Sequence, residues 1–128
     1  MSKALLDTSV VLALVHEGLE LADPPTEVAI SVVTACELHH GVLAASDKRR
    51  AMRLRALDWV RHHCETLPVE DDAAPRYGQL MFEAYWATGA RPEAGDTLIA
   101  ATALARDLPI LTRDRDFQAF PKVDVTYV

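Results

Sequence analysis

The chain has 128 residues, half of them apolar and a quarter charged, which favours a single domain over residues 1–128 with its own core. Its net charge of −6, from 13 Lys and Arg against 19 Asp and Glu, argues against a protein that holds nucleic acid by bulk charge alone. We expect no membrane span, and no signal peptide because Asp7 interrupts the apolar start; two cysteines suggest a cytoplasmic protein with reduced thiols.

Short apolar runs and helical periodicity predict strands that alternate with helices along the chain. In chain order, we expect a strand at 4–6, a helix at 8–15, a strand at 28–32, helices at 34–44 and 47–63, an extended segment at 65–69, a helix from about 72, a loop at 89–95, a helix from 96, a strand at 109–112, a helical turn at 114–120 and a strand at 123–128. The segment 98–105 is apolar on nearly every side, which indicates a buried helix. This alternation predicts an α/β sandwich with a mostly parallel sheet.

Four acidic residues fall where a parallel sheet collects ligands, at the carboxyl ends of its strands. Asp7 follows the first strand directly, and Asp114 follows the strand at 109–112. Glu37 lies early in the helix after the second strand, and Asp96 opens the buried helix. The four carboxylates are therefore expected to converge on one end of the fold.

Helix capping offers a simpler interpretation of the same acids, because acidic residues favour helix N-termini. The segment Thr34–Glu37 fits a capping box, Asp96 is a plausible N-cap, and Asp7 is a plausible start of the first helix. On spacing alone, both interpretations stay open.

Four segments in a fixed order resemble the PIN-domain ribonucleases, and most closely the VapC-type toxins of bacterial VapBC toxin–antitoxin pairs. The segments are Leu-Leu-Asp-Thr-Ser-Val at 5–10, Thr-Ala-Cys-Glu-Leu-His-His-Gly at 34–41, Gly-Asp-Thr-Leu-Ile-Ala at 95–100 and Leu-Thr-Arg-Asp-Arg-Asp-Phe at 111–117. Each segment is weakly diagnostic alone, but together they span nearly the whole chain.

The resemblance implies a PIN-like three-layer α/β/α sandwich with a carboxylate-bound Mg²⁺ centre, or Mn²⁺ in its place. The residues that match the catalytic and metal-binding acids of the family are Asp7, Glu37, Asp96 and Asp114, with Asp116 as a fifth, outer acid. Thr8 and Thr112 are candidates for orienting these carboxylates. Several carboxylates in one cleft repel one another, and a hard divalent cation relieves that repulsion.

The resemblance further implies a metal-dependent endoribonuclease toxin. Its expected partners are an RNA substrate, a cognate VapB-type antitoxin that inhibits it, and a second copy of the chain in a homodimer. Trp59 is a candidate for lining the groove that receives the antitoxin, while Tyr85 and Trp86 are expected in the core or at an interface.

Basic residues are few, and five of them are candidate RNA contacts. Arg49, Arg50 and Arg53 lie in the one basic cluster, which is either a solvated helix face or a surface that binds RNA phosphates. Arg113 and Arg115 flank Asp114 and are expected to pair with it or to touch substrate. The histidines do not follow a zinc-finger spacing, so no zinc site is predicted.

Two alternatives to the ribonuclease hypothesis stay open. A phosphohydrolase would use Asp7 as nucleophile and needs a lysine near the late strands, where Lys122 is poorly placed. A non-catalytic subunit would act only through complex formation with an antitoxin and DNA repression by that partner, because the chain has no helix-turn-helix signal of its own.

Overall fold

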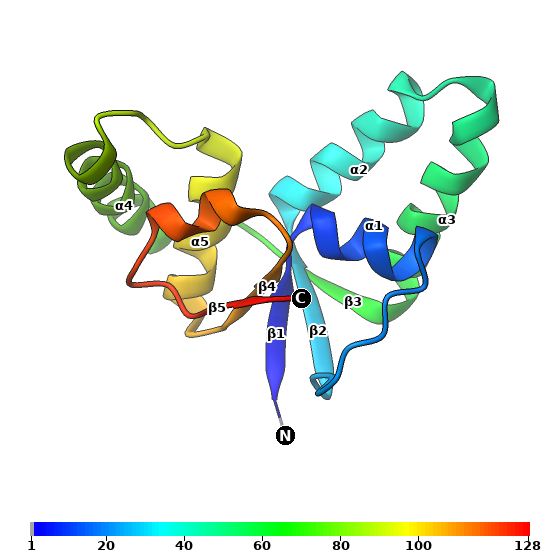
Figure 1. Cartoon of the computed structure of the whole chain (residues 1–128), viewed down its shortest axis with the longest axis horizontal. Coiled ribbons are helices and arrows are strands. Elements are labelled where there is room, and N and C mark those ends of the chain that lie inside the picture. The colour runs from blue at the N-terminus through cyan, green and yellow to red at the C-terminus, as the bar shows by residue number, and fades with distance from the viewer. Residues whose placement is uncertain (1) are drawn as a thin grey trace.

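The computed structural model describes residues 2–128 and consists of one five-stranded parallel sheet with helices on both faces (Figure 1). The elements are β1 (Lys3–Leu6), α1 (Thr8–His16), β2 (Glu27–Ser31), α2 (Val32–Ala44), α3 (Asp47–His63), β3 (Cys64–Leu67), α4 (Ala73–Thr88), α5 (Ala94–Arg106), β4 (Ile110–Thr112), the 3₁₀ helix η1 (Arg115–Ala119) and β5 (Val125–Tyr127). The expected alternation of strands and helices is confirmed.

The strand order is β3-β2-β1-β4-β5, and all four neighbouring pairs are parallel. From β1 the chain builds outward through β2 to β3, and then crosses to the other side of β1 to place β4 and β5. The order therefore reverses between β1 and β4, where Leu6 pairs with Leu111. In open parallel sheets, ligands bind at such a reversal, beyond the carboxyl ends of the strands.

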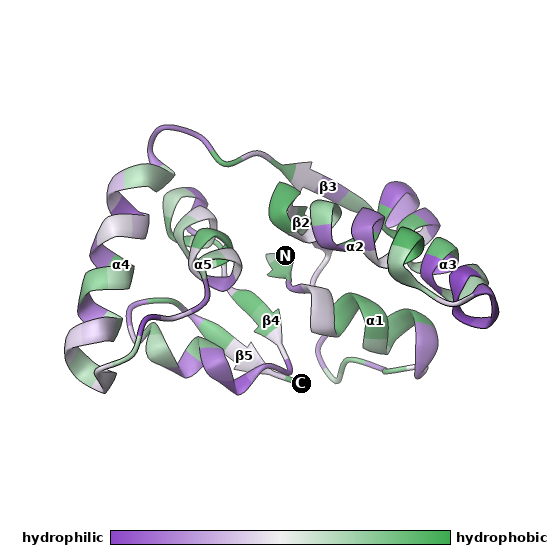
Figure 2. Cartoon of the chain, turned by 90° about the horizontal axis from the view of Figure 1, so that it is seen from above, coloured by the Kyte–Doolittle hydropathy of each residue, from purple (hydrophilic) through white to green (hydrophobic). Residues whose placement is uncertain are grey.

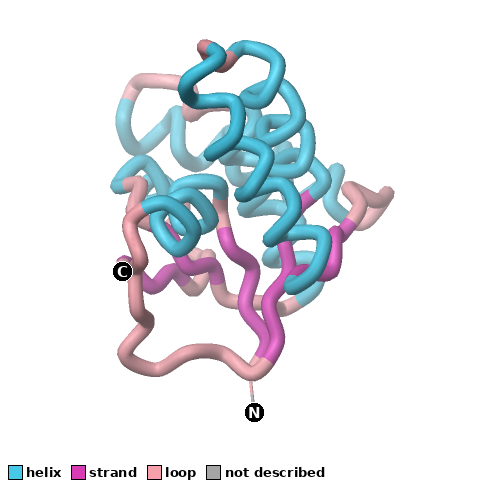
Figure 3. The backbone as a smooth tube through the Cα atoms, turned by 90° about the vertical axis from the view of Figure 1, so that its right-hand side faces the viewer, coloured by secondary structure: helices cyan, strands magenta, loops and turns pink. Residues whose placement is uncertain are grey.

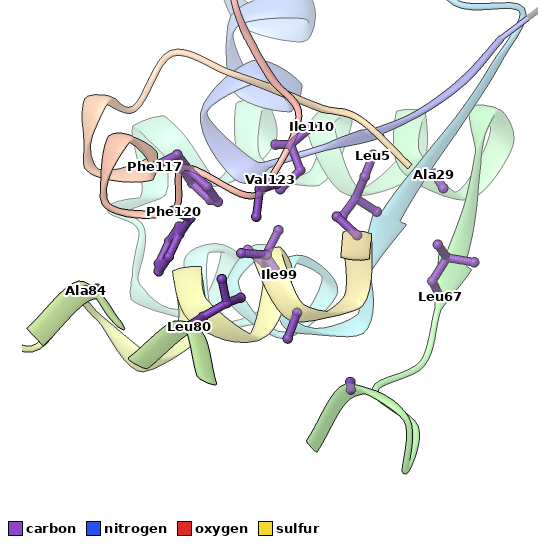
Figure 4. Close-up of a cluster of buried hydrophobic side chains, with 14 residues drawn as sticks. Leu5, Ala29, Leu67, Leu80, Ala84, Ile99, Ile110, Phe117, Phe120 and Val123 are labelled. Atoms are coloured by element: carbon purple, nitrogen blue, oxygen red, sulfur yellow. The ribbon is translucent and has the colours of Figure 1, made fainter. Parts of the chain in front are cut away.

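Alternate residues of the central strands supply two separate cores. Leu5 and Ile110 face the core beneath α4 and α5, which also holds Ile99, Phe117 and Phe120 (Figure 4). Leu6 and Ile30 point the other way and pack with residues of α1, α2 and α3. Seen from above, the two groups of helices lie on opposite sides of the strands (Figure 2). The predicted three-layer α/β/α sandwich is thus confirmed.

Two helices begin earlier than the sequence analysis expected. Helix α2 starts at Val32, after Ser31 accepts a hydrogen bond from the Val33 N–H, so Val32 is helical rather than part of the strand. Helix α5 starts at Ala94 with Glu93 at its N-cap position. The capping-box interpretation of 34–37 and the N-cap interpretation of Asp96 are therefore wrong.

The long connection from α1 to β2 runs back to the amino-terminal edge of the sheet, near the start of β1 (Figure 3). There Trp59 lines a hollow together with Lys3 and Glu27. These residues lie at the opposite end of the sheet from the predicted acids. Tyr85 and Trp86 are 51% and 74% exposed, so neither belongs to the core.

Within residues 2–128, no helix is both long and apolar enough to cross a membrane. Cys36 and Cys64 are free thiols, and burial raises the pKa of Cys64 to about 11. A thiol with that pKa is a poor nucleophile near neutral pH.

Replacing Leu80, which is buried on α4 (3% exposed), with alanine is expected to lower the free energy of unfolding by about 2–5 kcal/mol, because the lost methyl groups leave a cavity. The same change at Leu43, which is 81% exposed on α2, is expected to alter it by less than about 0.5 kcal/mol. Urea denaturation followed by circular dichroism compares the two variants. Equal losses would contradict the packing of α4 on the core.

Candidate metal centre

Asp7 occupies the turn between β1 and α1, and its carboxylate is almost fully buried at 4% exposure. One oxygen, Oδ1, accepts hydrogen bonds from the Ser9 hydroxyl at 2.6 Å and from the Val10 N–H at 3.2 Å. The other, Oδ2, accepts from the Thr112 hydroxyl at 2.7 Å. Asp7 is therefore the N-cap of α1, and three donors fix the direction of its carboxylate.

Thr112 links Asp7 to the second acidic segment. Besides donating to Asp7, its hydroxyl oxygen accepts a hydrogen bond from the Asp114 N–H at 2.9 Å. Asp114 in turn caps η1, since its Oδ1 accepts from the Asp116 N–H at 2.9 Å. One threonine at the end of β4 thus sets the relative positions of the acids that follow β1 and β4.

Asp96 lies in the first turn of α5, where its carboxylate makes no capping hydrogen bond. Carboxylate oxygens of Asp96, Asp114 and Asp116 all lie within 4.8 Å of one another. These three acids come from two different segments, the start of α5 and the turn after β4. Asp116, expected as an outer acid, is therefore one of the three closest carboxylates.

Glu37 lies on α2 and is exposed overall, while its carboxyl group is partly desolvated. Its Oε1 accepts a hydrogen bond from the Thr8 hydroxyl at 3.2 Å, which supports the predicted orienting role of Thr8. Glu37 does not belong to the three-acid group of Asp96, Asp114 and Asp116, although burial, followed by the charges of Glu93 and Asp7, raises its pKa.

Glu93 is an acid of this region that the sequence analysis missed. Its charge contributes to raising the pKa of both Asp96 and Glu37, after the larger effect of burial on each. Because the helix was expected to begin at Asp96, Glu93 was assigned to a loop. The usable signal was its spacing, since residues three apart at a helix start lie on the same side.

The crowding of carboxylates shifts their proton affinities. Burial, followed by the charges of Glu93 and Asp114, raises the pKa of Asp96 to about 7. Burial also raises the pKa of Asp7, against the lowering effect of its three hydrogen bonds, and burial raises that of Glu37. Without a cation, the region therefore holds protons that isolated carboxyl groups would release.

The donor set fits a hard divalent cation. Every candidate ligand is a carboxylate oxygen, the type preferred by Mg²⁺ and Mn²⁺. Opposite oxygens around Mg²⁺ are about 4.2 Å apart, close to the 4.8 Å limit that encloses the group of Asp96, Asp114 and Asp116. Among residues 2–128, this is the one cluster of three or more potential ligands, and it consists of three aspartates.

Among residues 2–128, none of the five arginines proposed from sequence forms an ion pair with the predicted acids. Arg113 pairs with Glu17 instead of Asp114, and the guanidinium of Arg115 lies 4.3 Å from the centre of the Tyr127 ring. The expectation that either pairs with Asp114 is wrong.

The remaining three arginines lie on α3. Arg50 bonds to Asp47 and to the carbonyls of Val42 and Ala45, so it braces the turn between α2 and α3. Arg49 and Arg53 line hollows that contain no member of the acidic cluster.

The chain is thus an all-parallel α/β sandwich with a cluster of carboxylates near its strand-order reversal, and such a cluster suits a divalent metal ion. The chain belongs to the PIN domain family, whose family model matches residues 4–123. It is 44% identical over 118 residues to ribonuclease VapC5 of Mycobacterium tuberculosis, which covers 90% of this chain and 85% of the relative. It is 36% identical over 129 residues to ribonuclease VapC4 of the same organism, and this match covers 96% of this chain and 95% of the relative.

A solved structure supports the same assignment. The chain matches a chain in the crystal structure of VapBC-5, a member of the VapBC family of toxin–antitoxin systems from Mycobacterium tuberculosis, with a TM-score of 0.80 and 41% identity. The match covers 100% of this chain and 98% of that one. The resemblance inferred from four short segments is confirmed over the whole chain.

Thr112→Val keeps the side-chain shape but removes the hydroxyl. We expect the free energy of unfolding to fall by about 1–3 kcal/mol, because Asp7 loses a buried donor and the Asp114 N–H loses its acceptor. Thr102→Val on α5 is the matched control, since that hydroxyl donates only to the Leu98 carbonyl of the same helix. Urea denaturation at pH 7 measures both, and an equal loss in the control would contradict the linking role of Thr112.

The metal-free protein is expected to lose stability as pH rises from about 4 to 7. Folding raises the pKa of Asp96 from its ordinary value of 3.8 to about 7, so in this range the unfolded chain has released a proton that the folded chain still holds. The slope of stability against pH should be shallower in Asp96→Asn. It should be unchanged in Asp23→Asn, because Asp23 is an exposed acid in the loop after α1. Thermal melts in EDTA across pH test this, and identical slopes in all three proteins would count against it.

Proposed function

We propose that this chain is a metal-dependent endoribonuclease, the toxin of a type II toxin–antitoxin pair that a cognate VapB-type antitoxin holds inactive. The observation that carries the proposal is the group of Asp96, Asp114 and Asp116 beside the buried Asp7, at the strand-order reversal of a PIN domain. The names of the similar proteins support it, since they are ribonucleases and one matching chain comes from a VapBC complex. A single domain and a cytoplasmic location stay predictions.

Asp96, Asp114 and Asp116 are the proposed holders of Mg²⁺, with Mn²⁺ as the alternative ion. When bound, the ion supplies positive charge to the attacked phosphate and activates water. That local charge also explains how a chain with a net charge of −6 can bind RNA at this point.

Asp7 and Glu37 have different proposed tasks from the three-acid group. Asp7 is held by Ser9, Val10 and Thr112, so it presents a fixed negative charge at no further ordering cost. Glu37 accepts a hydrogen bond from Thr8 and is exposed, so it is accessible to water and substrate.

Inhibition by the antitoxin follows from the same charges. An arginine from the partner that enters the acidic cluster would form charge-assisted hydrogen bonds with the carboxylates and compete with the metal. The Trp59 hollow lies at the amino-terminal end of the sheet, so an inhibitory side chain must reach the acids from another surface.

Two other functions have less support. A phosphohydrolase would need a lysine beside Asp7, but Lys3 pairs with Glu65 at the start of β1, and Lys122 pairs with Glu83 on α4 at 2.8 Å. A non-catalytic subunit has no use for a buried cluster of carboxylates, in which burial and then the neighbouring charges raise the pKa of Asp96 to about 7.

Purified, antitoxin-free protein is expected to cut total cellular RNA into discrete fragments in Mg²⁺ or Mn²⁺ and not in EDTA. Asp96→Asn should reduce cleavage by more than about 100-fold, because the metal loses a ligand and the site loses a charge. Asp23→Asn should cleave like the wild type. Gel electrophoresis measures the rates, and sequencing the fragment ends identifies the target RNA.

The same variants separate the ribonuclease from the non-catalytic subunit in cells. Asp96→Asn should abolish growth inhibition and still bind the antitoxin. Toxicity that persists in this variant would support action by binding alone.

A further inference from the structure

Arg91 shares a hollow with the candidate metal centre. It lies in the loop between α4 and α5, which crosses the top of the left-hand layer in Figure 1. The hollow, of about 230 Å³, is walled by Arg91 together with Asp96 and Asp116. Arg91 is the only basic side chain lining that hollow, so it is the one cation there that can meet a substrate phosphate.

Arg91 is also available for binding. Within residues 2–128 it forms no ion pair and no side-chain hydrogen bond, whereas Arg113 and Arg115, which lie closer in sequence to the acids, contact Glu17 and Tyr127. Because Arg91 forms no ion pair with the carboxylates that share its hollow, its N–H groups remain able to donate hydrogen bonds to a ligand.

A second hollow, of about 440 Å³, adjoins the first through the same residue. It lies along α4 and is lined by Arg91 and by Tyr77, Gly78, Met81, Phe82 and Tyr85. Phe82 and Tyr85 are 62% and 51% exposed, which is unusual for large aromatic side chains. Gly78 keeps the floor open, because a Cβ there would meet nothing within 4 Å.

We propose that the two hollows form a continuous subsite for single-stranded RNA, in which Arg91 binds a phosphate beside the cleaved one and Tyr85 and Phe82 stack with a neighbouring base. The inference rests on the proposed ribonuclease function and extends it to substrate positioning. Stacking of a base on an aromatic ring does not depend on the RNA sequence, and a guanidinium donates two hydrogen bonds to phosphate oxygens. Together, the two contacts suit a single strand of RNA, which offers both phosphates and unpaired bases.

A second copy of the chain is the competing occupant of the α4 surface. Phe82 also meets the ring of Trp86 edge to face, with 6.0 Å between centroids, and Trp86 is 74% exposed. A stable dimer would use this whole aromatic face, including Trp86. The RNA subsite instead uses the residues that line the hollow, and Trp86 is not one of them. The difference between Tyr85 and Trp86 therefore separates the two occupants.

The first test measures binding without cleavage. Because Arg91, Phe82 and Tyr85 are not metal ligands, the wild type should bind a fluorescein-labelled 12-nucleotide single-stranded RNA of mixed sequence in EDTA at low salt. Arg91→Gln should weaken binding about tenfold and reduce the slope of log affinity against log salt by about 0.7, the value for one phosphate contact on a single strand. Arg76→Gln is the matched control, since Arg76 lies at the other end of α4 and donates to the Asp72 carbonyl.

The second test separates stacking from dimerisation. Tyr85→Ala should weaken binding of the same RNA about tenfold, Tyr85→Phe should restore it, and Trp86→Ala should leave it unchanged. In cleavage assays, Arg91→Gln and Tyr85→Ala should raise KM far more than they lower kcat. Light scattering reports whether any of these variants changes the oligomeric state.

Specific outcomes overturn the inference. The first is that the wild type does not bind the RNA in EDTA. The second is that Arg91→Gln and Arg76→Gln weaken RNA binding equally. The third is that Tyr85→Ala and Trp86→Ala both lose the mass of a dimer, which would assign this face to a second copy. Failure of the ribonuclease proposal has a different signature, namely wild-type protein that binds the RNA and does not cut it with either metal.

Discussion

The burial of the Asp7 carboxylate at the junction of β1 and α1 is the constraint on which the site depends. A buried carboxylate is costly unless it is hydrogen-bonded, and here the donors come from α1 and from Thr112 at the end of β4. The bond to Thr112 joins residues 105 positions apart and ties the pairing of β1 and β4 to the placement of Asp114. Strand order and site geometry are therefore set by the same contacts.

The acids around Asp7 oppose the stability that this arrangement provides. Asp96 gains no capping hydrogen bond from its place in α5, and burial, followed by the charges of Glu93 and Asp114, raises its pKa to about 7. A sequence selected for stability alone would not keep such a residue beside Asp114 and Glu93. Local destabilisation of this kind is typical of functional sites, where a ligand compensates for it. The carboxylate oxygens and the PIN fold both indicate a divalent cation as that ligand.

Capping and metal binding were alternatives in sequence but are not alternatives in structure. Asp7 and Asp114 both cap helices and both point into the acidic region, because a cap residue lies where a strand ends and a helix begins. Asp96 and Glu37 do not cap, since their helices begin earlier, at Ala94 and Val32. The earlier helix starts remove the capping role of Asp96 and Glu37, whereas Asp114 both caps η1 and belongs to the three-acid group.

The sequence by itself determined the order of strands and helices, the sandwich architecture and the acids of the site. The elements and the sandwich depend on apolar runs and helical periodicity, whereas the candidate acids were selected by the resemblance of four short segments to the PIN family, because spacing alone left helix capping open. Only the tertiary structure decided that Asp116 joins the closest group, that Glu93 adds its charge, and that Arg113 turns to Glu17 while Arg91 faces the acids. Those outcomes depend on partners brought together by strand order and helix register, and long-range contacts of single side chains leave no periodic signal in a sequence.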